Sequence, residues 1–215
     1  MAEAMEAGTS PNEVALRIVG RIDDETGRRS GGIIGLTSRE AGFVEKARAE
    51  LESNDPAMMR QYLLRRTRDK RFDRSVKAAI RTGEPIDAGT ITRAADRMSD
   101  KLLKLRGDRI ARTELLGSLH EAQDEALRQM VDRGDLKPSQ IRRRWDAADD
   151  KYTRDSHNAL DDTVNGLDEP FVTIHGHSLM YPGDRSMGAP AEEIINCRCV
   201  LRIDVDYIAA LGPGD

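Results

Sequence analysis

The segment ITRAADRMSDKLLKL, residues 91–105, has the apolar pattern of a helix that is covered along one side. Its apolar side chains recur at spacings of four and three residues, which places them on one face of an α-helix. This seam consists of Ile91, Ala95, Met98, Leu102 and Leu105. A second helix could cover it, either from residues 56–82 of the same chain, as a helical hairpin, or from another protein.

Helix signals also precede the seam. Thr37 and Glu40 have the spacing of a capping box, so we expect a helix from Thr37 to about residue 53. Asp55 followed by Pro56 predicts the start of another helix, because aspartate caps helix N-termini and proline suits the first turn. That helix continues through a basic stretch and is expected to bend near Asp69.

After the seam, the apolar pattern resumes beyond Gly107 and ends near Gly134, a residue type that often follows the last helical turn. The pattern leaves open whether Gly107 breaks the helix. Pro138 predicts a shorter helix through Trp145 towards residue 148. Beyond residue 160 glycine and proline recur, and the β-branched segments FVTI (171–174) and CRCVLRIDV (197–205) predict strands.

These patterns predict a mainly α protein with a small C-terminal α+β module, in which a long helical arm precedes a loop-rich domain with short strands. The composition agrees, because 33% of the residues are charged and only 4% are aromatic, which is unusual for a β-sandwich. The predicted domains are an N-terminal helix with a Gly-rich linker (1–36), the helical arm (37–145), the α+β module (146–205) and a flexible tail (206–215).

The net charge of −4 is unevenly distributed. Residues 1–145 carry 29 Lys and Arg against 24 Asp and Glu, whereas residues 146–215 carry 5 against 14. Such asymmetry indicates different partners for the two parts. No apolar run approaches the roughly 20 residues that span a bilayer, and the acidic N-terminus is unlike a signal peptide, so we expect no membrane partner. We therefore expect synthesis in the cytoplasm.

The basic stretch RQYLLRRTRDKRFDRSVKAAIR, residues 60–81, is a candidate contact for double-stranded DNA. Phosphate backbones attract such patches because binding releases condensed counterions. The alternative is a solvated helix face whose charges keep the protein soluble. The candidate DNA contacts are Arg65, Arg66, Arg68, Lys70, Arg71, Arg74 and Lys77.

Both cysteines of the chain, Cys197 and Cys199, are separated by one residue. A disulfide between them would close a strained ring, and the cytoplasm is reducing, so we expect free thiols. One interpretation is that they pack in the core as small, soft side chains. The other is a structural zinc bound by both sulfurs and His157, with His175 or His177 as a further ligand.

Common catalytic motifs are missing from the sequence. It contains no phosphate-binding G-x-x-x-x-G-K-[ST] loop, no G-x-S-x-G nucleophile motif and no H-E-x-x-H zinc motif. Carboxylates are numerous, but none lies in an apolar setting that would raise its pKa for acid–base catalysis. On these grounds we expect a protein that is not an enzyme and has no catalytic residues.

Several segments, taken in order, resemble the Mu F-like minor head proteins of tailed bacteriophages, also called phage head morphogenesis proteins. They are GDRIARTELLGSLHEAQDEA (107–126), Trp145, TRDSHNALD (153–161), YPGD (181–184) and AEEIINCRC (191–199). The positions that match the family's motifs are Arg112, Glu114, Arg154, His157, Asn196, Cys197 and Cys199. The resemblance assigns no catalytic role to them.

The resemblance implies a minor capsid protein that lies inside the head near the portal vertex and acts in head assembly. Its implied partners are the portal protein, capsid proteins or further copies of itself, and the packaged DNA. With a portal as partner, the seam residues Ile91, Met98, Leu102 and Leu105 become candidate portal contacts. Two alternatives stay open, namely a metal-dependent hydrolase or nuclease and a helical DNA-binding module with no role in the virion.

Overall fold

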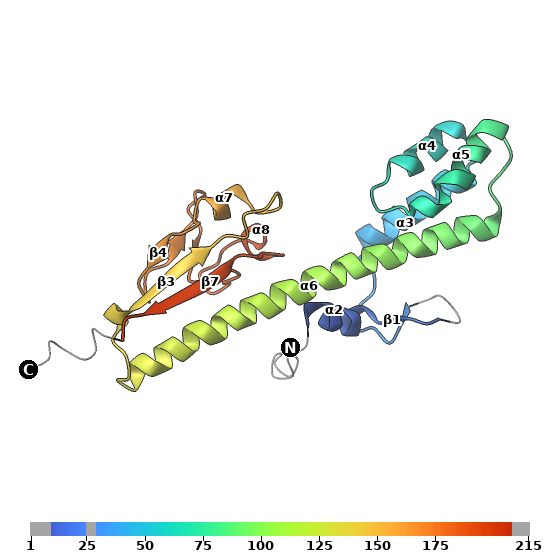
Figure 1. The fold of residues 1–215 in the computed structure, drawn as a ribbon. Helices are drawn as coiled ribbons and strands as arrows, with labels where there is room; N and C mark the ends of the chain where they lie inside the picture. The colour runs from blue at the N-terminus through green and yellow to red at the C-terminus, as the bar shows by residue number, and fades with distance from the viewer. Residues whose placement is uncertain (1–9, 25–28, 208–215) are drawn as a thin grey trace, which may run out of the picture. The chain divides into compact units, whose positions relative to one another are not determined.

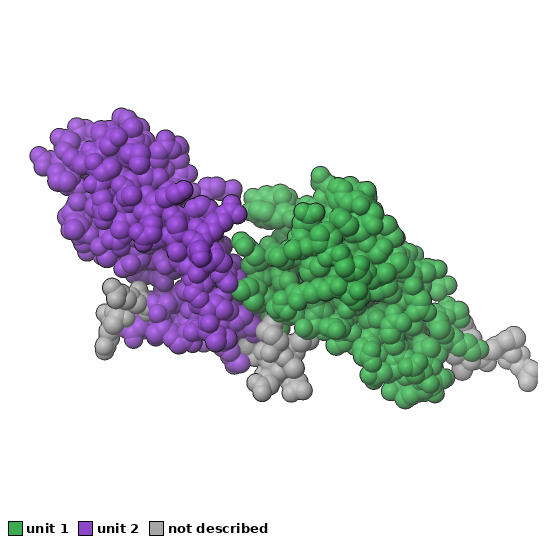
Figure 2. Space-filling model, turned by 180° about the vertical axis from the view of Figure 1, so that it is seen from behind, with its two compact units in different colours: residues 1–9, 109–215 green, residues 10–108 purple. Residues whose placement is uncertain are grey.

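The computed structural model describes residues 10–24 and 29–207. These residues form two compact units, residues 10–108 and residues 109–207 (Figure 2). Each unit has its own core. The longest helix, α6 (Ala88–Asp132), contributes its first part to one unit and its remainder to the other. The predicted fold class, mainly α with a small C-terminal α+β module, is confirmed. No described helix is both long and apolar enough to cross a membrane.

The 10–108 unit is helical apart from a short ribbon. Its capping box is confirmed, because the Thr37 hydroxyl accepts from the Glu40 N–H and the Glu40 carboxylate accepts from the Thr37 N–H, at 3.2 and 2.9 Å. Asp55 caps the following helix, as predicted. Before α6 the elements are α2 (Pro11–Val19), β1 (Arg21–Ile22), β2 (Arg29–Ser30), α3 (Ser38–Glu52), α4 (Pro56–Leu64), the 3₁₀ turn η1 (Lys70–Phe72) and α5 (Asp73–Thr82).

Helices α3, α4 and α5 gather over the N-terminal part of α6, and the core of the unit lies between them (Figure 1). Three of the four candidate portal contacts, Ile91, Met98 and Leu102, are between 1% and 8% exposed in this core. They are covered by the chain itself, which was the alternative that the sequence left open. Leu105, the fourth, is 46% exposed.

Helix α6 runs through Gly107 without a break. Gly107 is the place where α2 lies against α6, because a Cβ there would be 2.5 Å from Cγ1 of Val19 and 3.2 Å from the Ala15 carbonyl oxygen. Glycine therefore permits the close approach of the two helices at the expense of helix propensity.

The 109–207 unit combines the rest of α6 with a three-stranded antiparallel sheet in the order β4-β3-β7. The strands are β3 (Ile141–Asp146), β4 (Val164–Asn165) and β7 (Val200–Val205). A second ribbon pairs β5 (Phe171–Val172) with β6 (Ser178–Leu179). The 3₁₀ turn η2 (Pro138–Gln140) and two one-turn helices, α7 (Asp155–Asn158) and α8 (Ala191–Ile194), complete the unit.

The predicted helix over residues 138–148 is wrong, because β3 occupies most of that segment. Ile141, Arg143 and Trp145 alternate along the strand and are all fully buried. The predicted strand over 197–205 begins only at Val200, so the two cysteines precede β7. The predicted strand over 171–174 is reduced to Phe171–Val172.

The structure divides within α6, whereas the sequence predicted a domain boundary after Trp145. The reason is that the end of α6 shares a core with the β-strands, in which Leu127 packs with Ile141 and Leu167. The change in net charge after residue 145 therefore does not coincide with the boundary between the two cores. Most of the predicted tail, residues 208–215, and parts of the predicted 1–36 segment lie outside the described residues.

Candidate metal centre

His157 is placed by the one-turn helix α7, which begins after Arg154. Its backbone N–H donates to the Arg154 carbonyl at 3.0 Å, which fixes the turn. The imidazole is 1% exposed and lies edge-on to the Trp145 ring, with 5.1 Å between the ring centroids. The histidine is therefore held rigidly inside the core of the unit.

The segment between α8 and β7 carries both cysteines. Asn196, just before them, adopts a left-handed conformation with φ of 59°, which asparagine tolerates better than most residues. Its backbone N–H donates to Thr113 Oγ1 at 2.8 Å and its side-chain oxygen accepts from Arg112 at 2.7 Å. Helix α6 thus anchors this turn and orients the residues that follow.

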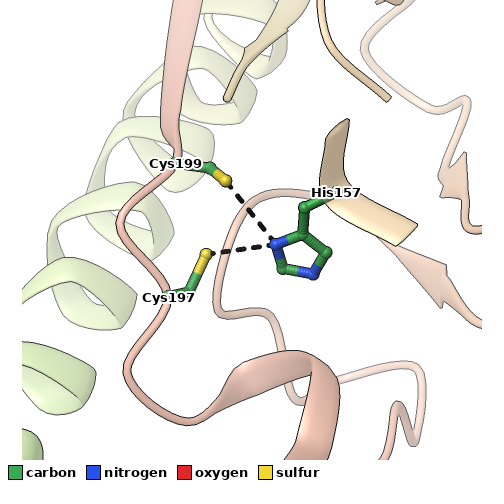
Figure 3. Close-up of side chains that lie close together, drawn as sticks. All are labelled: His157, Cys197 and Cys199. Carbon is green, nitrogen blue, oxygen red and sulfur yellow. Dashed lines mark hydrogen bonds between the residues drawn. The ribbon is translucent and has the colours of Figure 1, made fainter. Parts of the chain in front are cut away.

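Both sulfurs point at the same atom of His157 (Figure 3). The Sγ atoms of Cys197 and Cys199 each lie 3.5 Å from Nδ1 of His157. All three donor atoms lie within 4.8 Å of one another, and all three residues are buried. Arg198, between the cysteines, turns outward and pairs with Asp150. The structure therefore brings together the three residues that the sequence proposed as metal ligands.

The opposite edge of the His157 ring faces a buried carboxylate that the sequence analysis did not identify. Nε2 of His157 lies 3.2 Å from Oε2 of Glu193, although the angle is outside that of a hydrogen bond. Ser156 Oγ donates to Oε2 of Glu193 at 2.8 Å, and His177 Nδ1 lies 3.1 Å from its Oε1. Burial acts to raise the pKa of Glu193, but these hydrogen bonds and the two nearby imidazoles outweigh it and lower the pKa.

The other histidines named by the sequence do not join the three donor atoms. His177 reaches Glu193 instead, and His175 is exposed, with its ring centroid 6.2 Å from that of His177. The sequence contained a weak signal for Glu193, since it lies four residues before Cys197 in AEEIINCRC. Nothing in the sequence, however, distinguishes this glutamate from the many exposed ones.

The two thiols influence each other directly. A hydrogen bond between them is the largest influence on both, raising the pKa of Cys197 and lowering the pKa of Cys199 to about 4. Burial raises both pKa values, and a hydrogen bond with His157 further lowers that of Cys199. A deprotonated sulfur next to an imidazole nitrogen is the chemistry that soft and borderline metal ions bind.

The family profile described as phage Mu protein F like protein matches residues 70–202, well over half of the chain. The chain belongs to this family. The resemblance noted from the sequence motifs is thereby confirmed, and the matched range includes all three donor residues.

Two curated relatives of this Mu F-like protein match shorter segments. Minor head protein GP7 of Bacillus phage SPP1 is 36% identical over 70 residues, which are 33% of this chain and 22% of the relative. The NAD(+)–arginine ADP-ribosyltransferase EFV of Enterococcus faecalis (strain ATCC 700802 / V583) is 42% identical over 69 residues, or 32% of this chain and 13% of the enzyme. The aligned part is thus less than a quarter of either relative. No solved structure matches the chain significantly.

The positions that carry the family motifs surround the Cys197–Cys199 segment. Arg112 binds Asn196, and Arg154 donates to the carbonyl of Ile195. Glu114 pairs with Arg185 across a hollow between α6 and the segment after Tyr181, at 2.5 Å. Arg112 and Arg154 therefore hold the turn that precedes the two cysteines, whereas Glu114 contacts the segment after Tyr181.

The candidate DNA contacts divide into two groups in the structure. Arg65 makes a bidentate pair with Glu50 at 2.6 and 2.7 Å, and Arg68 makes one with Asp73 at 2.9 Å. These two are half-buried and serve the packing of the unit. The other five are exposed, namely Arg66, Lys70, Arg71, Arg74 and Lys77.

Part of the second group borders a basic hollow of about 390 Å³ in the 10–108 unit. Its lining brings together residues from the β1–β2 ribbon, the η1 turn and α6. Seven basic side chains and two acidic ones line it: Arg29, Arg68, Lys70, Arg71, Arg97, Lys101 and Lys104, with Asp69 and Asp100. The contribution of α6 is not evident in the sequence, because Arg97, Lys101 and Lys104 are far from the 60–81 stretch along the chain.

Proposed function

We propose that this Mu F-like protein is a minor head protein of a tailed bacteriophage, located inside the capsid near the portal vertex and acting in head assembly. Family membership and the 36% identity with a protein named minor head protein GP7 carry this proposal. The match to an ADP-ribosyltransferase covers 13% of that enzyme, so it adds little support for an enzymatic role in this chain. We favour a structural role over the hydrolase or nuclease alternative.

The portal is the proposed partner within the head, and the exposed end of the α6 seam is the proposed contact. Ile91, Met98 and Leu102 are enclosed in the core, so Leu105 is the seam residue that remains accessible. Leu105 is 46% exposed and continues the apolar seam of α6, so we propose it as the seam residue that contacts an apolar patch of the portal.

Packaged DNA is the second proposed partner. The basic hollow supports it, because clustered Lys and Arg bind phosphates without regard to base sequence. Side chains from the ribbon, the η1 turn and α6 surround the hollow, so seven cationic groups and two carboxylates gather around one concave surface. The non-virion DNA-binding alternative shares this surface but predicts no incorporation into heads.

The test is to co-express the chain with the major capsid and portal proteins of the same phage and to measure its amount in purified heads by mass spectrometry. We expect incorporation with the portal present and little incorporation without it. Equal incorporation in both cases would contradict the portal association. Absence from heads in both cases would contradict the head role and favour the non-virion alternative.

A pair of matched variants locates the contact. Leu105→Asp should reduce incorporation several-fold, whereas Leu119→Asp should not, although Leu119 is similarly exposed on the part of the same helix that belongs to the other unit. Circular dichroism checks that both variants keep their helices. A Leu105→Asp variant that enters heads normally would show that the portal binds elsewhere.

A further inference from the structure

Two cysteine sulfurs that converge on one imidazole nitrogen require a physical explanation. Nδ1 of a neutral histidine carries either one N–H or one lone pair, so it makes one well-formed hydrogen bond. Here two Sγ atoms, from Cys197 and Cys199, lie at the same 3.5 Å from it. Packing in the core explains burial, but it does not explain why both sulfurs point at a single nitrogen.

We propose that His157, Cys197 and Cys199 bind one Zn²⁺ ion, through Nδ1 and the two Sγ atoms, with a water molecule as the fourth ligand. The proposal is independent of the head role and rests on the geometry of the three side chains. It assigns the ion a structural task, which is to join α7 to the segment before β7.

The distances agree with a zinc tetrahedron. Zinc lies about 2.3 Å from thiolate sulfur and about 2.0–2.1 Å from imidazole nitrogen, and tetrahedral angles then separate sulfur from nitrogen by about 3.6 Å. The observed sulfur–nitrogen distances are both 3.5 Å. The donor set of two thiolates and one imidazole suits zinc better than magnesium or calcium, which prefer oxygen ligands.

The surroundings of His157 match those of a metal-bound histidine. When Nδ1 binds a metal, Nε2 carries the proton, and such a proton usually faces a carboxylate or a carbonyl. Nε2 faces the Glu193 carboxylate at 3.2 Å, and Glu193 is itself held by Ser156. This arrangement also explains why a 2% exposed glutamate is retained inside the module.

The charges also balance at the proposed site. Two thiolates neutralise the two charges of the zinc ion, so the buried centre carries no net charge. A buried charge without a compensating partner would destabilise the fold.

The fourth position is assigned to water because the described residues supply three donors to the cluster. Beside His157 and Cys199 is a small hollow of about 10 Å³, lined also by Tyr152, Arg154 and Arg198. A volume of this order holds one water molecule.

The ion would close a large loop of chain. It links residue 157 to residues 197–199, and Asn196 in turn is bound to α6 through Arg112 and Thr113. Small modules with thin cores often depend on such a metal for stability. Loss of the ion should therefore loosen the 109–207 unit and leave the separate core of the 10–108 unit intact.

The first test is the metal content of the full chain, purified under reducing conditions without added zinc. We expect about one zinc per chain, and much less in Cys197→Ser, Cys199→Ser and His157→Ala. The matched control is His175→Gln, an exposed histidine of the same module, which should keep its zinc. Folded wild-type protein without zinc that also fails to take up added Zn²⁺ would overturn the proposal.

A second measurement covers variants that fail to fold. Co²⁺ added to chelator-treated wild-type protein should give the intense thiolate-to-cobalt absorption of a tetrahedral site with two sulfurs. Chelation should also raise amide hydrogen exchange in residues 141–205 and leave residues 38–102 unchanged, with recovery on adding Zn²⁺. The absence of the cobalt band, or exchange that does not respond to chelation, would identify the cysteines as core residues.

Discussion

Tyr62 of α4 is fully buried in the core of the 10–108 unit, and its hydroxyl makes no hydrogen bond to a described residue. An unpaired buried hydroxyl lowers stability, because it gives up its hydrogen bonds to water without replacing them. Burial also raises the pKa of Tyr62 to about 12, with Asp73 and Asp69 adding to the shift. The same residue therefore influences stability at neutral and at alkaline pH.

We predict that Tyr62→Phe increases the free energy of unfolding by about 1 kcal/mol at pH 8, because it removes the unpaired hydroxyl and keeps the ring. The difference should grow above about pH 10, the ordinary tyrosine pKa. There the unfolded wild-type chain loses the phenol proton while the folded chain keeps it until about pH 12, so wild-type stability falls as pH rises.

Urea unfolding followed by far-UV circular dichroism, at neutral and alkaline pH, measures both effects. Tyr207→Phe is the control, because that side chain is 65% exposed and its loss of a hydroxyl should change little. If Tyr62→Phe proves less stable than the wild type, the hydroxyl has a partner in solution, such as a buried water.

The burial of Arg143 could not be predicted from the sequence. Arg143 lies in a run of three arginines, and arginine is almost always exposed. Yet it is fully buried and donates to the carbonyls of Gly166, Met180 and Glu169 at 2.6–3.0 Å. These acceptors come from loops 23 to 37 residues away, so local sequence carries no information about them.

At the level of elements, Gly107 and Gly42 are two helical glycines in different surroundings. A Cβ at Gly42 in α3 would meet nothing within 4 Å, whereas one at Gly107 in α6 would clash with α2. Helix propensity favours alanine over glycine by roughly 1 kcal/mol at both positions. Replacing each glycine by alanine therefore distinguishes the contribution of helix propensity to stability from that of packing between helices.

We predict that Gly42→Ala stabilises the protein by roughly 0.5–1 kcal/mol and that Gly107→Ala destabilises it by about 1–3 kcal/mol, because overpacking displaces α2. Chemical denaturation measures both, and hydrogen exchange in residues 11–19 reports the displacement. Adding Val19→Ala to Gly107→Ala should restore part of the loss, since Val19 is the nearest obstacle. A Gly107→Ala variant as stable as Gly42→Ala would rule out this packing role.

The elements that the sequence predicted well are those with local signals. The Thr37–Glu40 box and the Asp55–Pro56 start both act within one helical turn, and both are present. Strand β3 was missed because its structure depends on pairing with β7, where Ile141 lies opposite Val205. Pro138 is a typical helix start, but here it begins only the short η2 turn.

At the scale of the whole molecule, the sequence predicted which residues could form a metal centre without predicting how they meet. The i, i+2 spacing of the cysteines suggested a strand with both sulfurs on one face. The structure instead presents them from a turn that α6 holds in place through Arg112 and Thr113. The contacts of Asn196 with Arg112 and Thr113 span more than 80 residues of sequence, so local sequence patterns could not predict the turn that presents the sulfurs.

The basic residues of the 10–108 unit lie partly in the hollow and partly outside it. Lys101 and Lys104 of α6 line the basic hollow, whereas Arg74 and Lys77 of α5 are exposed and lie outside its lining. Replacing either pair by glutamate changes the net charge equally. If phosphates bind in the hollow, the α6 pair should matter more than the α5 pair.

We predict that Lys101→Glu/Lys104→Glu weakens binding to a short DNA duplex by roughly tenfold or more at low salt and makes binding less dependent on salt. Arg74→Glu/Lys77→Glu should weaken it by less than about threefold, through the general field alone. Fluorescence anisotropy over a salt series measures both variants, and circular dichroism checks their folding. Equal losses would assign DNA contact to the whole basic surface, and a greater loss with the α5 pair would return it to the helix face that the sequence first suggested.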